Sequence, residues 1–422
     1  MSNHQTSRRR RDGLLALRWF VHVVFICMVI VWAAHPEDPS RLFRRLMFPC
    51  TGLFIMVMAI PAIRGKVLAL LRSRLRVADL ILWNLLLGFV LCELLLRGIG
   101  GLMSSPLLAS PNAGSDRRIH LWRGRPHGTF NGKTLNALGL FDDDFQVERQ
   151  AGVRRVAALA DSFGVGVVPF EQNFLTLLDE YVDASCETEV LNFGIATLGP
   201  TDYLHLWRTE VRRYDPDQVL LCFFVGNDIE KQRHRRSILH TDSMLIFTMF
   251  KRLRAVSGEA RNWEVMKPER PTFSEGAFRE IELDRLAFCK RKLGDREGKA
   301  YEATFRVLKT ISDEIGPRLC VAIVPDEFQV NDALYESLVG DRAGEYERRL
   351  PNKRLAEFFD RLGIPHLDLL EPLLLAQRDA PTYKPRDTHW NRLGNEVAAR
   401  ALADWLGDLP QARGGTDHDP SG

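Results

Sequence analysis

The side chains best suited to covalent chemistry in this sequence are a serine, a histidine and an aspartate from two distant segments. Ser162 follows an apolar run in "VAALADSFGVGV" (156–167), and Asp387 and His389 stand together in "RDTHWNRLGN" (386–395). A serine hydroxyl is a poor nucleophile unless a base takes its proton, and a neighbouring carboxylate holds a histidine in the tautomer that can do so. These residues therefore predict a catalytic triad with Ser162 as nucleophile, His389 as base and Asp387 as the acid that orients the base.

Groups that could stabilise an oxyanion follow two other apolar runs. Gly194 lies in "NFGIATLG" (192–199) and Asn227 lies in "VGND" (225–228). When a serine attacks an ester carbonyl, negative charge develops on the carbonyl oxygen, and losing one donor to that oxygen typically slows the reaction by about 10²–10³. We expect the backbone N–H groups of Ser162 and Gly194 and the side-chain amide of Asn227 to be these donors.

Four further residues are candidate substrate contacts, because each stands beside a predicted catalytic residue or at the end of an apolar run: Asp161, Asp228, Asp326 and Trp390. Each motif also has a structural interpretation. An Asp-Ser pair can cap a helix, a glycine can serve backbone geometry alone, an Asn-Asp pair can end a strand in a turn, and a histidine can be purely structural. The catalytic interpretation is favoured, because all these structural interpretations would have to hold at once.

The elements that must bring these residues together are strands and helices that alternate from about residue 117. Short β-rich runs are found at 154–160, 188–193, 218–225, 318–324 and 364–369. Amphipathic stretches occur at 171–183, 201–213, 299–315, 353–362 and 392–406. Continuous apolar strands that alternate with helices indicate an α/β fold, a three-layer α/β/α sandwich with a mainly parallel, flavodoxin-like sheet. Ligands of such sheets bind beyond the carboxyl ends of the strands, where the serine, glycine and asparagine motifs lie.

The blocks that hold these motifs resemble those of the SGNH hydrolases, also called the GDSL esterase/lipase superfamily. "ADSFGVG", "NFGIATLG", "VGND" and "DTHWN" are similar, in this order, to the nucleophile, glycine, asparagine and acid–histidine blocks of the family. "NALGLFDDDF" (136–145) and "PDEFQV" (325–330) are similar to stretches of its bacterial, membrane-anchored members. The resemblance covers about residues 117–408, and it implies a serine esterase with the triad and oxyanion donors named above.

Two departures from the family pattern concern the nucleophile and the acid. Ala160 replaces the glycine before the Asp-Ser pair, and it is small enough for a tight turn. Asp387 lies two residues before His389 instead of three, which is similar to the D-x-H-W block of polysaccharide O-acetyltransferase-like members, and Arg386 in the three-before position cannot be the acid. Residues i and i+2 of an extended segment project to the same side, so we expect Asp387 to reach the imidazole.

Residues 229–298 interrupt the alternation of strands and helices and are interpreted as an insertion. They contain a basic run from Lys231 to Arg236, the apolar patch "MLIFTMF" (244–250) and a polar, proline-containing link. Such an insertion can be a substrate lid, a surface that rests on the membrane or a peripheral helical excursion. The polar, glycine-rich residues 409–422 are expected to be a disordered tail.

Residues 1–100 are expected to form a membrane anchor with three transmembrane helices. Apolar runs at about 14–34, 47–63 and 78–96 are each close to the roughly 20 residues needed to cross a bilayer. Nine basic residues flank these runs on one side of the membrane and three on the other, which predicts a cytoplasmic N-terminus. Three crossings would leave the folded domain in the periplasm or outside the cell, anchored in the bacterial inner (cytoplasmic) membrane. The alternative for 14–34 is a cleaved signal peptide.

Composition narrows the classes of function. The chain has 57 Lys and Arg against 54 Asp and Glu, and the basic excess lies in residues 1–100, so the folded domain is mildly acidic and is not expected to bind nucleic acid. The sequence has no glycine-rich phosphate loop and no metal-ligand spacing. We therefore expect neither a metal nor a cofactor.

Together these patterns predict a membrane-anchored serine esterase that acts outside the cytoplasm, with a small acyl ester or an acylated glycan as substrate and acetyl as the favoured acyl group. Three alternatives stay open. The acyl group could pass to an extracytoplasmic polysaccharide, the substrate could be a lipid ester if the "MLIFTMF" patch forms a membrane-facing lid, or the chain could be a non-catalytic glycan-binding or assembly module of the same fold. The sequence does not indicate an oligomeric state.

Overall fold

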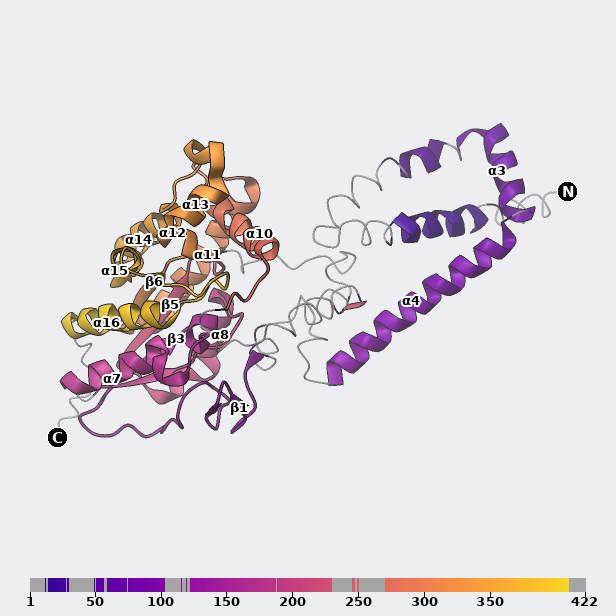
Figure 1. Ribbon diagram of the computed structural model, residues 1–422. Coiled ribbons are helices and arrows are strands. Elements are labelled where there is room, and N and C mark those ends of the chain that lie inside the picture. The colour runs from indigo at the N-terminus through magenta and orange to yellow at the C-terminus, as the bar shows by residue number, and fades with distance from the viewer. Residues whose placement is uncertain are drawn as a thin grey trace. The chain divides into compact units, whose positions relative to one another are not determined.

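The computed structural model describes residues 14–27, 51–56, 59–73, 75–102, 122–186, 188–229 and 270–409, with the isolated positions 12, 29, 49, 115, 119, 245, 246 and 249 (Figure 1). The chain forms two compact units. The first comprises Met1–Ala113 and Arg235–Ser257, and the second comprises Gly114–His234 and Gly258–Gly422. The predicted α/β domain lies in the second unit.

The second unit is built on a sheet of five strands: β3 (Arg154–Leu159), β4 (Thr188–Asn192), β5 (Gln218–Phe224), β6 (Leu319–Val324) and β7 (His366–Asp368). Their order is β4-β3-β5-β6-β7, and every neighbouring pair is parallel. This is the flavodoxin-like order, in which the direction of the connections reverses after the first two strands. Each strand coincides with a predicted apolar run, which confirms the prediction of an α/β fold with a parallel sheet.

Helices cover both faces of the sheet. The main ones are α7 (Phe174–Cys186), α8 (Pro200–Thr209), α11 (Asp295–Ile315), α14 (Leu350–Leu362), α15 (Leu370–Gln377) and α16 (Arg392–Asp408). Successive residues of a strand point to opposite faces, so Ala157 and Leu159 of β3 pack in one core with α8, α11 and α14, whereas Val156 and Ala158 pack in the other with α7, α15 and α16. Figure 1 shows α7 and α16 side by side. The domain is therefore a three-layer sandwich.

Shorter elements complete the second unit: β1 (Thr129–Phe130), β2 (Lys133–Thr134), α6 (Ser162–Val165), η2 (Phe170–Gln172), η3 (Val211–Tyr214), α10 (Glu275–Leu286), η5 (Ala287–Cys289), η6 (Gly316–Arg318), α12 (Glu327–Val330), α13 (Asp332–Val339) and η7 (Gly340–Glu345). β1 and β2 pair as a small antiparallel hairpin. The short helices α6 and α12 each begin three residues after the last residue of a strand of the sheet, so their first turns stand at its carboxyl edge.

The predicted insertion at 229–298 does not form one separate excursion. From residue 270 onward it belongs to the second unit, where Phe278 and Leu286 of α10 are buried. Leu286 and Cys289 share a small core with Phe328 and with residues of α13. This part of the predicted insertion is therefore an integral piece of the α/β domain.

The described part of the "MLIFTMF" patch belongs to the first unit. Leu245 is buried, and the N–H groups of Leu245 and Ile246 donate to the carboxylate of Glu93 at 2.8 and 2.9 Å. Arg97, four residues after Glu93, donates to the same carboxylate at 2.7 Å. The patch thus contacts the predicted membrane anchor. The basic run 231–236 and residues 410–422 of the predicted tail lie outside the described residues.

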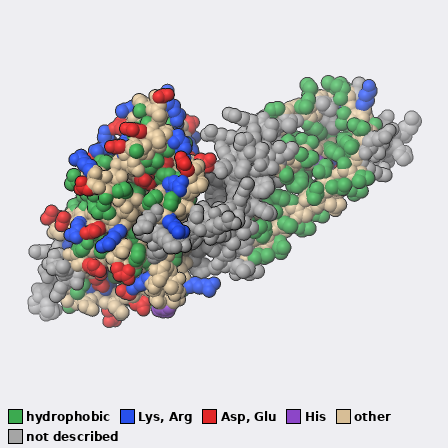
Figure 2. All heavy atoms as spheres, viewed as in Figure 1, with side chains coloured by type: hydrophobic (Ala, Val, Ile, Leu, Met, Phe, Trp, Pro, Cys, Tyr) green, Lys and Arg blue, Asp and Glu red, His purple; other side chains and the backbone are tan. Residues whose placement is uncertain are grey.

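The first unit also contains α3 (Pro61–Ser73) and α4 (Arg76–Leu102). Within the described residues, one helix, Val77–Ile99, is long and apolar enough to cross a membrane, and the apolar helix Leu14–Cys27 is shorter. Figure 2 shows hydrophobic side chains over the surface of this unit, and on α4 more than half of the side chain is exposed at Val77, Leu80, Ile81, Leu85, Leu91, Leu94 and Leu95. The third predicted crossing thus has a helix of suitable length. The other two runs are only partly described, so their crossings stay predictions.

Candidate active site

Ser162 lies just beyond the carboxyl end of β3, at the first position of α6. Asp161 caps this helix, because its Oδ1 accepts a hydrogen bond from the Phe163 N–H at 3.0 Å. The cap turns the chain sharply after the strand and presents the Ser162 hydroxyl to the loop before α16. The helix-cap interpretation of the Asp-Ser pair is therefore correct, and it is compatible with a nucleophilic serine.

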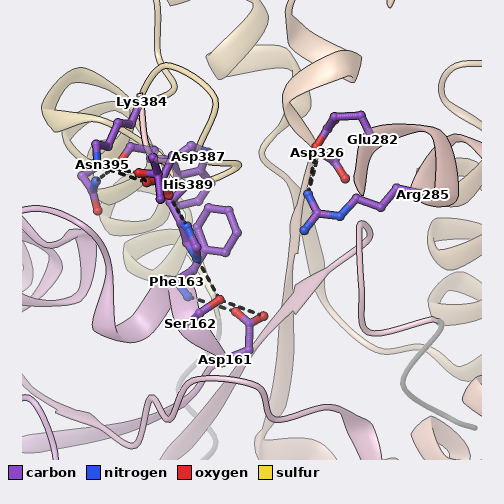
Figure 3. A network of polar contacts seen from close by, with 12 residues as sticks. Asp161, Ser162, Phe163, Glu282, Arg285, Asp326, Lys384, Asp387, His389 and Asn395 are labelled. Atoms are coloured by element: carbon purple, nitrogen blue, oxygen red, sulfur yellow. Dashed lines mark hydrogen bonds and ion pairs between the residues drawn. The ribbon is translucent and has the colours of Figure 1, made fainter. Parts of the chain in front are cut away.

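His389 and Asp387 lie in the loop between α15 and α16 and meet Ser162. His389 Nε2 lies 2.9 Å from Ser162 Oγ, and His389 Nδ1 lies 2.7 Å from Asp387 Oδ1. Figure 3 shows the imidazole between the serine and the aspartate. The fold thus brings the three predicted triad residues into one chain of hydrogen bonds, although 227 positions separate Ser162 from His389.

The loop that carries the acid and the base is a tight turn, not the extended segment that we expected. The Lys384 N–H donates to the carbonyl of His389 at 2.9 Å. Arg386 and Thr388, on either side of Asp387, have left-handed φ angles of 47° and 73°. Residues other than glycine rarely adopt such angles, and this kind of strain is concentrated at functional sites. Asp387 reaches the imidazole because the chain turns there, so the predicted contact is present for a different geometrical reason.

Asp387 has two further partners that the sequence analysis did not identify. Lys384 Nζ donates to Asp387 Oδ2 at 3.1 Å, as Figure 3 shows, and the Thr272 hydroxyl donates to the same oxygen. Burial by itself would raise the pKa of Asp387, but the hydrogen bonds from His389 and Thr272 and the charges of His389 and Lys384 lower it to about 2. The acid is therefore ionised at neutral pH, as stabilisation of an imidazolium requires.

No pattern in the sequence pointed to these two partners. Thr272 stands 115 positions before Asp387, inside the segment interpreted as an insertion, and Lys384 belongs to none of the recognised blocks. For Lys384, a weak indication is its spacing from Asp387. A lysine three residues before an acid must find a partner if it is buried, but the sequence does not say that it is buried.

Aromatic side chains pack behind the base. The ring centroid of Phe163 lies 5.1 Å from that of His389 and 4.8 Å from that of Trp390, and Trp390 in turn lies 5.3 Å from Phe174. Trp390 is only 1% exposed. It is therefore a core residue that supports the loop, and the prediction that it contacts substrate is corrected because almost none of its surface is accessible.

Gly194 has a different role from the predicted one. Its N–H donates to Asn192 Oδ1 at 2.8 Å, and Asn192 Nδ2 donates to the Gly164 carbonyl at 2.8 Å. The N–H of Gly194 is therefore engaged within the protein, and the prediction that it receives the oxyanion does not fit this geometry. The structural interpretation is correct: Gly194 permits the turns after β3 and β4 to approach closely, and Asn192 joins them.

Asn227 and the Ser162 N–H are the remaining predicted oxyanion donors. In the part of the chain that the structure describes, neither the Ser162 N–H nor the Asn227 amide hydrogen-bonds to a protein group, and Asn227 Oδ1 is buried without a partner. Buried polar groups are normally paired, so exceptions of this kind call for an explanation. The atom without a partner is an acceptor, so an oxyanion does not satisfy it; the donor that an oxyanion would use is Nδ2 of the same amide.

Asp228, beside Asn227, is a structural residue. It is fully buried, and its Oδ2 accepts hydrogen bonds from the Phe224 N–H at 3.0 Å and from the Tyr203 hydroxyl at 3.2 Å. These contacts stabilise the turn that follows β5. The prediction that Asp228 contacts substrate is corrected, because its carboxylate is enclosed by protein.

Asp161 and Asp326 are corrected in the same way, since they are 1% and 0% exposed. Asp326 caps α12 through the Glu327 N–H at 2.7 Å and pairs with Arg285 of α10 at 3.4 Å. Glu282 is also buried beside Arg285, and burial, followed by the charge of Asp326, raises the pKa of Glu282. Figure 3 shows this cluster apart from the triad, where it ties α10 to the end of β6.

No group of three or more His, Cys, Asp or Glu side chains in the described ranges is placed to hold a metal ion. The arrangement that the structure does contain is a serine, a base and an acid in hydrogen-bonding order, with an unengaged backbone N–H and an unengaged amide at the neighbouring strand end. Chemically, this arrangement can activate a hydroxyl for attack on a carbonyl and stabilise the charge that results.

Several solved structures are similar to this chain at low identity. They include a lipase/acylhydrolase from Enterococcus faecalis (16% identity, 61% of this chain and 98% of that chain covered, TM-score 0.34). They also include a catalytic mutant of an acetylxylan esterase from Geobacillus stearothermophilus (11%, 60% and 94%, TM-score 0.34) and a member of the lipolytic G-D-S-L family from Veillonella parvula (14%, 61% and 100%, TM-score 0.33). The comparison with curated proteins gave no match.

A family model matches the C-terminal part of the second unit. Residues 293–419 match the SGNH hydrolase-like domain of the acetyltransferase AlgX. This range contains Asp387 and His389 and runs from the start of α11 to beyond α16. The predicted resemblance to the SGNH hydrolases is thereby confirmed, and the matched residues include the acid and the base of the predicted triad.

Proposed function

We propose that the protein is a serine esterase that forms an acyl-enzyme on Ser162. The observation that supports this most directly is the pair of contacts that His389 makes, at 2.9 Å to the Ser162 hydroxyl and at 2.7 Å to the Asp387 carboxylate. A non-catalytic module of the same fold would not need to keep all three groups in hydrogen-bonding order.

In the proposed reaction, His389 Nε2 takes the proton of Ser162 as its Oγ attacks the ester carbonyl carbon. The Ser162 N–H and the Asn227 amide donate to the oxyanion. The tetrahedral intermediate then expels the alcohol, which takes the proton from His389, and the acyl group stays on Ser162. In the second half His389 takes a proton from water, the water oxygen attacks the acyl-enzyme, and the carboxylic acid leaves with Ser162 reprotonated.

We propose a small acyl group, acetyl above all, esterified to a glycan hydroxyl as the substrate. The support is the match of residues 293–419 to a domain described for an acetyltransferase. The same match favours a second candidate, in which the acetyl group passes from Ser162 to the hydroxyl of an extracytoplasmic polysaccharide. The two reactions share the acyl-enzyme and differ only in whether water or a sugar hydroxyl accepts the acyl group.

We further propose that the first unit anchors the chain in the bacterial inner membrane, with the α/β unit in the periplasm or outside the cell. Val77–Ile99 is long and apolar enough to cross. The five basic residues between 64 and 76 favour a cytoplasmic start for this helix. Alkaline phosphatase fused after residue 409 should be active in cells, because that enzyme folds only outside the cytoplasm, and an inactive but stable fusion would contradict this topology.

The function is tested by release of p-nitrophenol from p-nitrophenyl acetate by the full chain in detergent. Ser162→Ala should abolish release, whereas Ser337→Ala, which changes an exposed serine of α13, should leave it unchanged. Equal release by the Ser162→Ala variant would overturn the mechanism. If the wild-type chain releases no p-nitrophenol, labelling by a fluorophosphonate tests whether the serine is activated. Modification of Ser162 that requires His389 supports an activated serine, and the absence of labelling contradicts it.

The choice between esterase and transferase is made by product analysis. The acyl-enzyme is formed from p-nitrophenyl acetate in the presence of increasing concentrations of an acceptor oligosaccharide. Free acetate as the only product supports hydrolysis. An acetylated oligosaccharide that increases with acceptor concentration at the expense of acetate supports transfer.

A further inference from the structure

The two oxygens of the Asp387 carboxylate have different partners. Oδ1 faces the imidazole of His389 at 2.7 Å. Oδ2 accepts a hydrogen bond from Lys384 Nζ at 3.1 Å and another from the Thr272 hydroxyl. Lys384 Nζ also donates to Thr272 Oγ1 at 2.7 Å, so the ammonium, the hydroxyl and the carboxylate form a closed triangle.

Lys384 makes these contacts from inside the protein, where only 1% of its side chain is exposed. A buried ammonium is costly unless a charge and hydrogen bonds compensate it, and breaking one half of a buried ion pair is strongly destabilising. The carboxylate of Asp387 is likewise 3% exposed. The acid of the triad is therefore one half of a buried ion pair, and its negative charge is shared between the imidazole and the ammonium.

Thr272 reaches this pair from a segment far away in the chain. The backbone ties that segment to the catalytic loop, because the Phe273 N–H donates to the Arg386 carbonyl at 2.9 Å. Ser274 then caps α10 by accepting from the Ala277 N–H at 3.3 Å. The hydroxyl of Thr272 is thus held against Oδ2 by a fixed stretch of backbone.

We propose that Lys384 and Thr272 are positioning residues of the triad, which orient the Asp387 carboxylate and limit how strongly it stabilises the imidazolium of His389. The role in turnover rests on the proposed esterase function. Held by two donors on Oδ2, the carboxylate presents Oδ1 to the imidazole. The ammonium partly neutralises the carboxylate, so it weakens the attraction between the carboxylate and a protonated imidazole.

The charged groups around His389 define what else could influence its protonation. Lys384, Arg386 and Asp387 lie on its own loop, and Asp161 lies beside Ser162. Glu327, at the start of α12, is close enough to Asp387 for their charges to interact. Burial raises the pKa of Glu327 to about 7, and the charge of Asp387 also raises it. Glu327 is therefore the neighbour whose titration could be confused with that of the imidazole, and the experiment has to separate the two.

The test is the pH dependence of kcat/KM for p-nitrophenyl acetate, measured on the full chain. Lys384→Met removes the ammonium and keeps the length of the side chain, and Thr272→Val removes the hydroxyl and keeps the shape. In both variants the uncompensated carboxylate stabilises the imidazolium more. The acidic limb, which is the fall of kcat/KM at low pH, should therefore move to higher pH. The expected shift is on the order of half a unit to one unit for Lys384→Met and less for Thr272→Val.

Three control variants separate this effect from general damage. Thr272→Ser keeps a hydroxyl and should retain the wild-type limb. Lys309→Met removes one cation at an exposed position of α11 and should also retain it. Glu327→Gln removes the neighbouring titration, and the shift caused by Lys384→Met should persist in that background. A limb that stays in place in both Lys384→Met and Thr272→Val, with the variants still folded and active, would overturn the proposal.

A second measurement does not depend on turnover. Diethyl pyrocarbonate modifies neutral imidazoles, and mass spectrometry of the His389 peptide gives the rate of modification at each pH. The midpoint of this rate should rise in Lys384→Met and Thr272→Val but not in Thr272→Ser. If the wild-type chain hydrolyses no ester, the esterase proposal fails while this midpoint still decides the proposal about Lys384 and Thr272. An unchanged midpoint contradicts it.

Discussion

Gly194 and Gly164 touch through their backbones where the turns after β4 and β3 meet. A Cβ added to Gly194 would lie 2.7 Å from the Gly164 Cα, and one added to Gly164 would lie 2.8 Å from the Gly194 Cα. Real Cβ atoms do not approach backbone this closely, so the contact requires glycine on both sides. The turn that positions Ser162 therefore depends on a glycine in the block that follows the next strand.

Gly194→Ala should displace the Ser162 turn. We expect a loss of about 1–3 kcal/mol in the free energy of unfolding, typical of overpacking, and a fall in kcat of about 10²-fold if the hydroxyl moves by about 1 Å. Differential scanning fluorimetry and p-nitrophenyl acetate hydrolysis measure the two effects. Gly298→Ala is the control: it adds a methyl group in open space within α11 and should stabilise slightly. A Gly194→Ala variant with wild-type Tm and kcat would contradict the contact.

Asp387→Asn should lower kcat of the folded protein about 10⁴-fold, because an amide cannot hold the imidazole in the required tautomer, and it should also lower Tm, because the buried ammonium of Lys384 loses its counter-charge. Since the pKa of Asp387 is held at about 2, its stabilising ionisation is fully present above the unfolded value of 3.8 and is lost only as the pH falls toward 2. A fall in the rate below a pH between 5 and 8, if measured, therefore could not come from Asp387. An activity loss of less than tenfold would argue against its role as the triad acid.

Asn227 and Asp228 are neighbours in the chain, but we expect substitution of Asn227 to lower kcat and substitution of Asp228 to lower Tm. Asn227→Ala removes an oxyanion donor, so kcat should fall by about 10²–10³ with little change in KM or Tm. Asp228→Asn weakens the buried contacts with Phe224 and Tyr203, so Tm should fall while kcat of the folded fraction changes little. Steady-state kinetics and thermal unfolding of both variants check this. The assignment would be reversed if Asp228→Asn proved the catalytically weaker of the two.

Glu282→Gln should stabilise the protein, and more so as the pH rises. Burial and the charge of Asp326 raise the pKa of Glu282, so the folded state holds a proton that the unfolded state releases above its ordinary value near 4.5. Stability is therefore lost as the pH rises above that value, and glutamine removes this loss. The Tm difference between Glu282→Gln and wild type should be larger at pH 8 than at pH 5.

Arg285→Met is the counterpart of that variant. It leaves the buried carboxylate of Asp326 without its cation and the carboxyl group of Glu282 without its hydrogen-bond donor, so we expect a loss of about 3–5 kcal/mol. The free energy of unfolding from denaturant titration measures it. A cost below 1 kcal/mol would show that the ion pair does not stabilise the packing of α10 against β6.

The sequence by itself determined the sheet and the triad. The strands are continuous apolar runs, a local property that does not depend on the rest of the fold, and parallel strands place their carboxyl ends on one edge. Ser162 follows β3 after two residues, so its position at the carboxyl edge of the sheet is set by the strand. Asp387 and His389 are two residues apart, so the chain between them keeps the acid close to the imidazole. The resemblance of four ordered blocks to the SGNH hydrolases then supplied the proposed role of each residue.

Only the tertiary structure decided which polar residues stay accessible and which are enclosed. Asp161, Asp228, Asp326 and Trp390 stand beside predicted catalytic residues or at the end of an apolar run, yet all four are buried, because burial depends on packing against elements far along the chain. For the same reason Gly194 donates to Asn192 and not to the site. Thr272 supports the acid from 115 positions away, through a contact that arises only when α10 packs beside the catalytic loop.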